Sequence, residues 1–517
     1  MSPAIRVLSD IPRRQAAERS DAIAVQCGDG RLTYGELDAN SRKAAALLIG
    51  AGVQPGQRVA WLGRSHETFF ELLFGCCLAR ACFAPINNRL AIGEIAFILD
   101  DSTADLIFVT ADLLAAAQAA TAQISRPIRI FTVDAPATGL DHYPAQRDAA
   151  SGPAREPQPA DDVVQLYTSG TTGLPKGVRI TNANMEAFLG PAMTFEGMNN
   201  TPDDVFVSCM PLFHVGGMNP DLTALAGGAK LVVIPAFDPP LVLKILESEG
   251  ATRTGFVPAM INMLLQHPDC ATTDFSSLKS LVYGASPISE AVLTAARARF
   301  GCRFTQVFGM TETNAAGTVL HDDHHQPHLL RSCGKSWATH EVRIAGDDGE
   351  EVAPGEVGEI QVRGPAVMSG YWNRPEATAE TITPEGWLKT GDAGYRNDDG
   401  YFFVHDRVKD MIVSGGENVY PAEVENAILG CPGVADAAVI GVPDARWGEA
   451  VKAIVVRAPG AEIGEDAVIA WARERIAGYK APKSVDFIDA LPRNATNKVL
   501  RRVLREPYWA GHGRLVG

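Results

Sequence analysis

The clearest limit on the fold of this chain is a short apolar strand that leads into a loop of hydroxyl residues and glycines. Val163-Val164-Gln165-Leu166 is followed by Tyr167-Thr168-Ser169-Gly170-Thr171-Thr172-Gly173-Leu174-Pro175-Lys176-Gly177. Such a run predicts a buried strand that ends in an exposed loop. Glycines let the backbone approach a ligand, hydroxyl and N–H groups donate to anionic oxygens, and Lys176 adds a positive charge. The sequence therefore predicts a phosphate-binding loop.

This loop differs from the common nucleoside-triphosphatase loop, in which a Gly-Lys pair is followed directly by Ser or Thr. Here Pro175 precedes Lys176 and Gly177 follows it, so the Mg²⁺-binding hydroxyl is missing from its usual place. The alternative is a Ser/Thr/Gly linker on the surface, but linkers rarely carry a Pro-Lys-Gly directly after a buried strand.

Length and periodicity predict a multidomain α/β protein. A chain of 517 residues is too long for one core. Strand-like runs such as Arg58–Leu62, Leu106–Val109 and Leu281–Tyr283 alternate with helical segments, which predicts helices layered on largely parallel sheets. From about residue 341 short strands and turns indicate a small distorted β-barrel, and the residues after 410 indicate a separate α+β unit that includes a helix at Pro421.

Charge and cysteine content exclude several classes of function. The net charge of −15 argues against nucleic acid as a partner, because binding to a phosphate backbone needs a basic face. Nine cysteines without a C-x-x-C pair indicate unpaired thiols in a reducing compartment, so we expect a cytoplasmic protein. No secretory signal is visible, and Glu71, Arg80 and Pro85 interrupt the most apolar window, which predicts a buried helix and no transmembrane segment.

The loop at 167–178 resembles the adenylation loop of the adenylate-forming superfamily, which includes acyl-CoA synthetases, peptide-synthetase adenylation domains and beetle luciferases. Four more segments are similar to motifs of that superfamily in the expected order, so the resemblance covers essentially the whole chain: Phe308-Gly309-Met310-Thr311-Glu312, Thr390-Gly391-Asp392, Asp406–Glu425 and Pro492–Arg502. The resemblance implies an N-terminal domain at 1–405 that holds the ATP and acyl sites. A hinge at 406–410 and a mobile α+β C-terminal domain at 411–517 follow.

The same resemblance implies roles in nucleotide binding. Thr168 and Lys176 would help to hold the outgoing phosphates, and Glu312 would hold Mg²⁺, which usually takes only one or two carboxylates. Lys498 would bridge the carboxylate and the α-phosphate, although Asn497 stands where relatives usually have glycine. The residues expected to contact ATP are Thr168, Ser169, Gly170, Thr171, Thr172, Gly173, Lys176, Gly284, Ala285, Ser286, Phe308, Gly309, Met310, Thr311, Asp392, Arg407 and Lys498.

Further positions are assigned to CoA binding and to domain motion by resemblance. Lys409 falls at the hinge position, and Gly415 and Gly416 match the loop that borders the pantetheine channel. Trp447 and the run Tyr479–Lys483 fall where CoA-binding relatives contact the CoA nucleotide, and the alternative for Trp447 is simple core packing.

The acid pocket is expected at a segment that resembles the acyl-pocket region of the superfamily. His214, Gly216, Gly217, Met218 and Asn314 are its main candidates, with Phe256 and Ala315–Gly317 beside them. These residues are small or apolar, without an obvious basic residue for a second carboxylate, which favours a bulky hydrophobic monocarboxylate. Fatty, aryl and steroid-like acids stay open. The histidines of 321–328 lack ligand spacing and are expected to form a polar loop.

The sequence therefore predicts an acyl-CoA synthetase that uses ATP, Mg²⁺ and CoA. One alternative is an acyl-AMP ligase that loads a carrier protein, although no carrier domain follows in the chain. A luciferase-like oxygenase is not excluded by the motifs. A non-catalytic binding protein on the same fold is disfavoured by the presence of Thr168, Glu312, Asp392 and Lys498 together. The oligomeric state is open, and a homodimer is one option.

Overall fold

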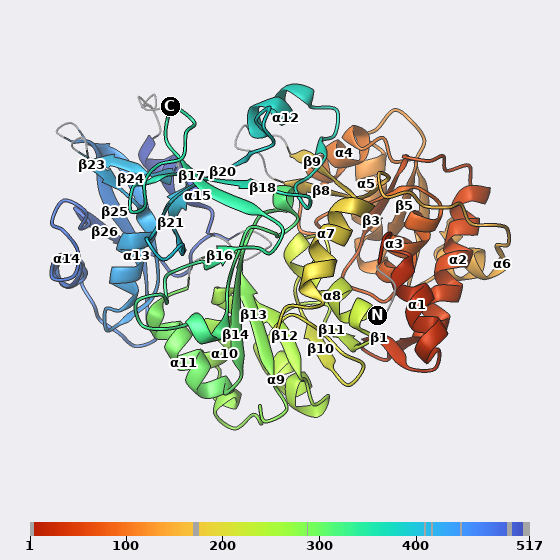
Figure 1. The fold of residues 1–517 in the computed structure, drawn as a ribbon, viewed down its shortest axis with the longest axis horizontal. Helices are drawn as coiled ribbons and strands as arrows, with labels where there is room; N and C mark the ends of the chain where they lie inside the picture. The colour runs from red at the N-terminus through yellow and green to blue at the C-terminus, as the bar shows by residue number, and fades with distance from the viewer. Residues whose placement is uncertain are drawn as a thin grey trace.

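The structure is a computed structural model that describes residues 5–168, 175–286, 288–407, 410–414, 417–444, 447–493 and 499–509. Four β-sheets with surrounding helices build the described part of the chain (Figure 1). Two large, mainly parallel sheets hold the N-terminal half, a smaller antiparallel sheet follows, and a mixed sheet contains the C-terminal residues. The predicted layered α/β class is confirmed.

The first large sheet has eight strands and carries the predicted phosphate loop at one edge. Its strands from β4 to β7 pair in parallel, whereas β9 and β19 add antiparallel. The strand order is β19 (Gly370–Tyr371), β9 (Lys176–Thr181), β8 (Asp162–Thr168), β4 (Cys82–Pro85), β3 (Arg58–Leu62), β5 (Leu106–Val109), β6 (Arg129–Thr132) and β7 (Asp141–His142). The helices of this region are α2 (Tyr34–Gly50), α3 (Thr68–Leu78), α4 (Ile92–Asp101), α5 (Leu114–Thr121), α6 (Tyr143–Ala149) and α12 (Pro375–Thr381).

The second large sheet has nine strands, with a parallel centre and antiparallel edges. Its order is β16 (Lys335–Ser336), β15 (Thr318–Leu320), β14 (Arg303–Phe308), β13 (Ser280–Gly284), β12 (Arg253–Phe256), β10 (Val205–Ser208), β11 (Lys230–Val233), β1 (Ile23–Cys27) and β2 (Gly30–Thr33). The associated helices are α1 (Asp10–Arg19), α7 (Asn182–Ala192), α8 (Val215–Gly227), α9 (Pro239–Ser248), α10 (Pro258–Gln266) and α11 (Glu290–Phe300).

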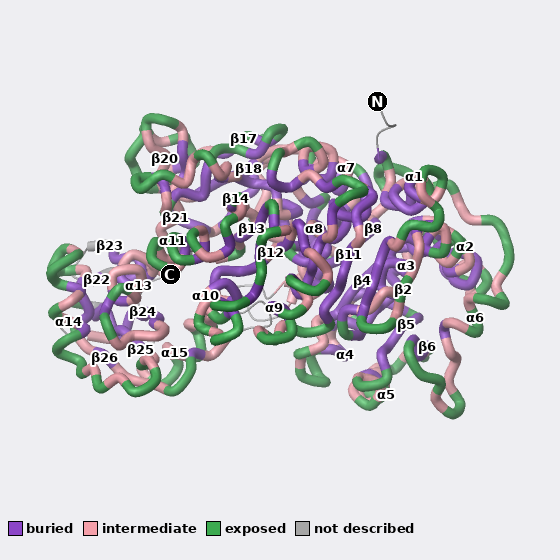
Figure 2. The backbone as a smooth tube through the Cα atoms, turned by 90° about the horizontal axis from the view of Figure 1, so that it is seen from below, coloured by how far each residue is buried: buried purple, intermediate pink, exposed green. Residues whose placement is uncertain are grey.

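Each face of the nine-stranded sheet has its own hydrophobic core. Phe206, Leu231 and Val233 face α7 and α8, in a core that continues into the eight-stranded sheet. Val207 and Val232, one residue along their strands, face α9, α10 and α11. This alternation follows from the two-residue period of a strand. The strands at the middle of both sheets, such as β4 and β11, are buried (Figure 2), and the removal of this apolar surface from water stabilises the fold.

The β-barrel predicted after residue 341 is present as a half-barrel. It consists of four antiparallel strands in the order β17 (Glu341–Ala345), β18 (Gly358–Arg363), β20 (Leu388–Arg396) and β21 (Phe402–Arg407). Ile344, Ile360, Val362 and Phe402 form its small core. The strand order is open in the described residues, which is the difference from the expected distorted barrel.

The C-terminal residues form a separate sheet with cores of their own. Its strands are β22 (Ile412–Ser414), β23 (Glu417–Val419), β24 (Val434–Asp444), β25 (Gly448–Arg457) and β26 (Ser484–Phe487), and its helices are α13 (Pro421–Leu429), α14 (Glu465–Arg473) and α15 (Arg501–Trp509). The chain passes from one sheet to the other between Arg407 and Ile412, the segment in which the hinge is predicted.

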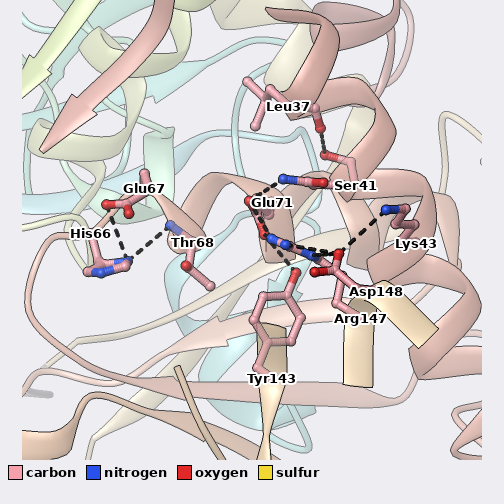
Figure 3. Close-up of polar contacts among 11 residues, drawn as sticks. Leu37, Ser41, Lys43, His66, Glu67, Thr68, Glu71, Tyr143, Arg147 and Asp148 are labelled. Atoms are coloured by element: carbon pink, nitrogen blue, oxygen red, sulfur yellow. Dashed lines mark hydrogen bonds and ion pairs between the residues drawn. The ribbon is translucent and has the colours of Figure 1, made fainter. Parts of the chain in front are cut away.

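Within the N-terminal region a buried polar cluster joins α3 to α6 (Figure 3). Glu71 is almost fully buried and accepts two hydrogen bonds from Arg147, at 2.7 and 2.9 Å. Tyr143 and Asn40 donate to the same carboxylate at 3.0 and 2.8 Å. A buried charge needs such partners, so this cluster stabilises the packing of the helices and lies apart from the predicted nucleotide site.

Two broad sequence expectations concern thiols and membranes. All nine cysteines are free, and eight of them are buried, as expected for small apolar core residues. Among the described residues, no helix has both the length and the apolar character needed to cross a bilayer.

Candidate active site

The phosphate-loop residues that the structure describes meet the predicted magnesium ligand where two sheet regions join. Thr168 ends β8 and Lys176 begins β9, and the two are direct cross-strand partners at the base of the loop. Thr168 Oγ1 donates to Glu312 Oε1 at 3.3 Å. Glu312 comes from a single 3₁₀ turn, η3 (Thr311–Thr313), which follows β14. Residues 144 positions apart in sequence are therefore adjacent.

Tyr371 completes this cluster. Its hydroxyl donates to Glu312 Oε1 at 2.9 Å, and the Nζ of Lys176 lies 5.0 Å from the centroid of its ring. Burial and the neighbouring Glu312 charge raise the pKa of Tyr371, so the phenol stays protonated and can donate. The cluster places one buried carboxylate, two hydroxyls and one ammonium group together. Such a set can bind a hard divalent cation and phosphate oxygens.

The predicted adenine segment and the Phe308–Glu312 motif lie at the carboxyl ends of two adjacent parallel strands. Gly284 ends β13 and pairs with Val307 of β14. A Cβ at Gly284 would lie 2.2 Å from the Val307 carbonyl oxygen, so only glycine fits. Ala285 then adopts a left-handed φ of 69° and is exposed. Crevices outside the carboxyl ends of parallel strands are the usual ligand sites of α/β sheets.

The predicted ribose-binding residues lie opposite each other in the half-barrel. Asp392 on β20 is the cross-strand partner of Arg407 on β21. Thr390 fixes the turn, because its Oγ1 donates to the Ile360 carbonyl at 2.7 Å and accepts from the Asp392 amide at 3.1 Å. The Asp392 residue is 9% exposed. Fifteen residues separate Asp392 from Arg407 in the sequence, and the pairing of β20 with β21 places them directly opposite each other.

Four residues of the expected acid pocket lie just before α8 or in its first turn. His214 precedes this helix, and its Nε2 is buried without a hydrogen-bond partner among the described residues. Burial and the charge of Arg89 lower the pKa of His214 to about 4, so the ring is neutral at pH 7. Gly216 is exposed on the first turn, whereas Gly217 and Met218 are buried. A Cβ at Gly217 would lie 2.4 Å from the Pro211 carbonyl oxygen.

Two expected pocket residues have core contacts in the structure. Asn314 is fully buried, and its amide donates to the Asn184 carbonyl at 3.1 Å while its oxygens accept from Asn219 at 3.0 Å. Phe256 packs in the hydrophobic core on the face of the sheet that α9–α11 cover, away from α8. Asn314 and Ala315 both have left-handed φ values, 51° and 64°. This turn therefore orients the residues that follow Glu312, with the Asn314 side chain as its anchor.

The predicted CoA residues lie in the C-terminal unit. Trp447 and Tyr479 are both exposed, at 39% and 42%, which disfavours core packing for Trp447. Lys480 forms an ion pair with Glu423 at 2.8 Å, and Ala481 is fully buried, whereas Lys483 is exposed. Several other predicted site residues lie outside the described residues: Ser169, Gly170, Thr171, Thr172, Gly173, Lys409, Gly415, Gly416 and Lys498.

Sequence reasoning missed Tyr371 and the buried cation Arg253. Tyr371 stands in a two-residue strand, β19, that pairs with β9 beside the phosphate loop. Arg253 begins β12, in which half-buried and buried residues alternate, and lies at a small cavity next to α8. An arginine in a strand of uncharged residues was the available signal for the second. The histidines of 321–328 contact separate partners, for example Tyr283 with His325 and Tyr401 with His324.

Comparisons with known proteins agree with this geometry. The sequence pattern of the family described as AMP-binding enzyme matches residues 12–372, and that of the AMP-binding enzyme C-terminal domain matches residues 423–498. The chain is 42% identical over 506 residues to a feruloyl-CoA synthase from an Amycolatopsis species, covering 97% of this chain and 99% of the relative. It is 37% identical to the fatty acid–[acyl-carrier-protein] ligase ScoC of Streptomyces coeruleorubidus, covering 99% of both.

Among solved structures, the fold is similar to that of ATP-bound MatB from Rhodopseudomonas palustris. The TM-score is 0.88 at 28% identity, with 98% of this chain and 100% of the other covered.

Proposed function

The chain belongs to the AMP-binding enzyme family, and from this premise we propose how its site works and which acids it takes. It is an AMP-forming acid–thiol ligase, an ATP-dependent acyl-CoA synthetase that acts on hydrophobic acids. The residue roles below, the use of Mg²⁺ and the narrower choice of acid are our proposals.

The observation that carries the proposal is the cluster of Thr168, Glu312 and Tyr371 beside Lys176. Two hydroxyls orient one buried carboxylate next to a lysine, at the base of a loop rich in glycine and hydroxyl groups. These donors fit Mg²⁺, which prefers oxygen ligands, takes few carboxylates and shares its shell with substrate phosphates. Glu312 would hold the ion, and the bound ion would neutralise charge on the phosphates.

In the first half-reaction an oxygen of the acid carboxylate attacks the α-phosphorus of ATP. The bond from that phosphorus to the β-phosphate bridging oxygen breaks, and acyl-AMP and pyrophosphate result. No side chain serves as a nucleophile. Lys176 and the loop hydroxyls stabilise the negative charge of the departing pyrophosphate, and Asp392 fixes the ribose. We assign to Lys498 the contact that bridges the carboxylate and the α-phosphate.

In the second half-reaction the CoA sulfur attacks the acyl carbonyl carbon. The bond between that carbon and the phosphate oxygen breaks, AMP leaves, and the thiol proton is released. We propose that the C-terminal unit turns about Lys409 between the two steps, which withdraws Lys498 and brings Gly415 and Gly416 to the thiol channel. Such a motion uses one acid pocket for two reactions. The passage between separate sheets at residues 407–412 supports this arrangement.

For the acid we propose an aryl-substituted monocarboxylate first and a fatty acid second. Gly216 leaves open space at the start of α8, where an added Cβ would meet only the Met210 side chain, at 3.9 Å. His214 is neutral, so it offers no charge to bind a second carboxylate. A basic residue, Arg253, lines a small cavity farther along α8. The feruloyl-CoA relative supports an aryl acid.

The second candidate is an acyl-AMP ligase that loads a carrier protein. Two observations favour it: the similarity to ScoC, and the pairing of Lys480 with Glu423, which leaves fewer free cations for CoA phosphates. Exposed Trp447 and Lys483 favour CoA. We also place the enzyme in the cytoplasm, where nine free thiols would stay reduced.

Product analysis tests the proposal. Purified protein is incubated with MgATP and a pool of aryl, aliphatic and polycyclic acids, with and without CoA, and the products are identified by mass spectrometry. We expect AMP and one class of acyl-CoA when CoA is present. Acyl-AMP that accumulates equally with and without CoA would identify the carrier-protein ligase instead.

A further inference from the structure

The face of α8 that begins with Gly216 leads along the helix to a small cavity beside the nine-stranded sheet. Gly216, Pro220 and Thr223 follow each other at helical spacing, so they share one side of α8. Pro220 and Thr223 line a cavity of about 10 Å³, together with Phe206, Arg253, Ser280 and Val282 from three strands. At the next position of the same face, Gly227 has no space, because a Cβ would lie 2.3 Å from the Asn200 carbonyl oxygen. The open part of this face thus ends near Asn200.

Two independent estimates, one along α8 and one along β13, place the cavity far from the predicted nucleotide site. Along α8, Thr223 lies nine residues after His214, which corresponds to about 14 Å of helix. Along β13, Ser280 lies four residues before Gly284, which corresponds to about 13 Å of strand. The face of the sheet between them carries small side chains, with Gly255 and Val282 as direct partners. An acid with its carboxylate at His214 would direct its other end toward Ser280 and Arg253.

The far end holds one donor and one acceptor that make no hydrogen bond to the described residues. The donor is Arg253 Nε, which makes no hydrogen bond although it lies 3.3 Å from Asp204 Oδ2. That oxygen already accepts from the amide and the hydroxyl of Thr201, at 2.9 and 2.8 Å. The other Arg253 nitrogens contact Ser280 Oγ at 2.8 Å and Asn199 Oδ1 at 3.5 Å.

The acceptor is Asn200 Oδ1. Asn200 is 8% exposed, and its Nδ2 donates to the Met198 carbonyl at 3.0 Å, which fixes the orientation of the amide. Asn200 and Arg253 line the same cavity. A buried donor and a buried acceptor without partners both cost free energy, and the cavity has room for about one water-sized group.

We propose that this cavity is a hydroxyl-binding subsite, and that the preferred acid carries a hydroxyl on the end remote from its carboxylate. A hydroxyl donates one hydrogen bond and accepts others. It would donate to Asn200 Oδ1 and accept from Arg253 Nε, satisfying both groups at once. Arg253 is partly neutralised by Asp204, so a second carboxylate is not required there. This inference rests on the proposed function and narrows its substrate class.

The test compares acids that differ only in the distal hydroxyl. One pair is 4-hydroxycinnamate and cinnamate, and the other is 10-hydroxydecanoate and decanoate, with kcat/KM measured by AMP release. We expect the hydroxylated member of at least one pair to be preferred by about ten- to hundredfold, because an analogue without the hydroxyl leaves both buried groups without a hydrogen bond. The pair that shows the preference identifies an aryl or an aliphatic substrate.

Two variants assign the preference to the subsite. Asn200→Leu removes the acceptor, and Arg253→Lys removes Nε while it keeps a charge beside Asp204. In each, the ratio of the two kcat/KM values should fall toward one, and because the ratio is taken within a variant, a partial loss of folded protein cancels. Arg303→Lys is the matched control: Arg303 is the partner of Ser280 on the next strand, but it is exposed and pairs with Glu196.

Three outcomes would overturn the inference. They are equal kcat/KM for both members of both pairs, a preference for the unhydroxylated acids, or a preference that survives both variants. In each of these the enzyme still releases AMP with some acid, so the proposed function stands. No AMP release with any acid of the four would instead count against the proposed function as well as the subsite.

Discussion

At the scale of single residues, the most unusual group is the carboxyl of Asp221, which lies in the core around α8 and makes no hydrogen bond to the described residues. Asp221 is fully buried, and neither of its oxygens has a hydrogen-bond partner in the described chain. Burial raises the pKa of Asp221 well above its usual range, and the Ser208 hydroxyl, which is nearby but outside hydrogen-bond geometry, lowers it by less. The residue is therefore held in its neutral form, unlike the ion-paired Asp204, which directly precedes β10.

This difference predicts opposite effects of two matched substitutions. Because folded Asp221 keeps its proton while the unfolded chain loses it above about pH 4, the native state is destabilised as pH rises. Asp221→Asn should raise the melting temperature, and by more at pH 8 than at pH 5. Burial raises the pKa of Asp204, but hydrogen bonds from Lys279 and Thr201 outweigh it, and the net shift is downward. Asp204→Asn should lower the melting temperature, with a smaller loss at low pH.

Thermal unfolding of both variants from about pH 3 to pH 8 checks the prediction, because the Asp204 contribution declines only below the unfolded pKa of about 4. An Asp221→Asn protein that melts below the parent at every pH would show that the carboxyl has a partner or a functional charge. The expected change is on the order of 1–3 kcal/mol, because each unit of difference between the folded and the unfolded pKa is worth about 1.4 kcal/mol.

At the scale of elements, the short strand β19 brings Tyr371 to the phosphate hairpin of β8 and β9. Tyr371→Phe removes one hydrogen bond to a charged group, so the kcat/KM for ATP should fall about ten- to hundredfold while folding is kept. Tyr143→Phe is the matched control, since the Tyr143 hydroxyl also donates to a buried glutamate, Glu71, away from the site. That variant should lose stability with little change in kcat/KM.

Steady-state kinetics and melting temperatures of the two tyrosine variants separate these effects. If both variants lost activity in proportion to stability, Tyr371 would be only a packing residue and the assignment of Glu312 as the magnesium ligand would lose its main structural support.

The elements themselves could largely be predicted from the sequence. The apolar runs at Arg58–Leu62 and Leu106–Val109 are strands β3 and β5, and the Pro421 start of α13 was visible from its first-turn residues. Tyr371 could not be predicted, because a two-residue strand carries no periodic signal. The subsite at Arg253 could not be predicted either, because its partners Asn199 and Ser280 come from a loop and a different strand.

At the scale of the whole molecule, the account requires two arrangements of one acid pocket and one C-terminal unit. Lys498→Ala should abolish acid-dependent pyrophosphate release but leave thioester formation from supplied acyl-AMP within about threefold, because Lys498 acts only in the first state. The first half-reaction is followed by pyrophosphate release, and the second by thioester formation from purified acyl-AMP. Equal loss of both would show that Lys498 does not belong to the first state alone.

The position of the hinge is also a property of the whole molecule that the sequence indicates only through resemblance. The described strands show two separate sheets on either side of residues 408–411. Which acid fills the pocket depends on side-chain packing around α8. No local sequence pattern encodes that packing, since Asn200 and Arg253 are brought to one cavity by the fold alone.

Oxygen transfer from the acid to AMP tests the central claim most directly. The enzyme is incubated with an acid labelled with ¹⁸O in its carboxylate, together with ATP and CoA, and the AMP is analysed by mass spectrometry. The account predicts one ¹⁸O in each AMP, because a carboxylate oxygen bonds to the α-phosphorus and stays there when the thiol attacks. Unlabelled AMP, or label in pyrophosphate, would contradict an acyl-adenylate intermediate.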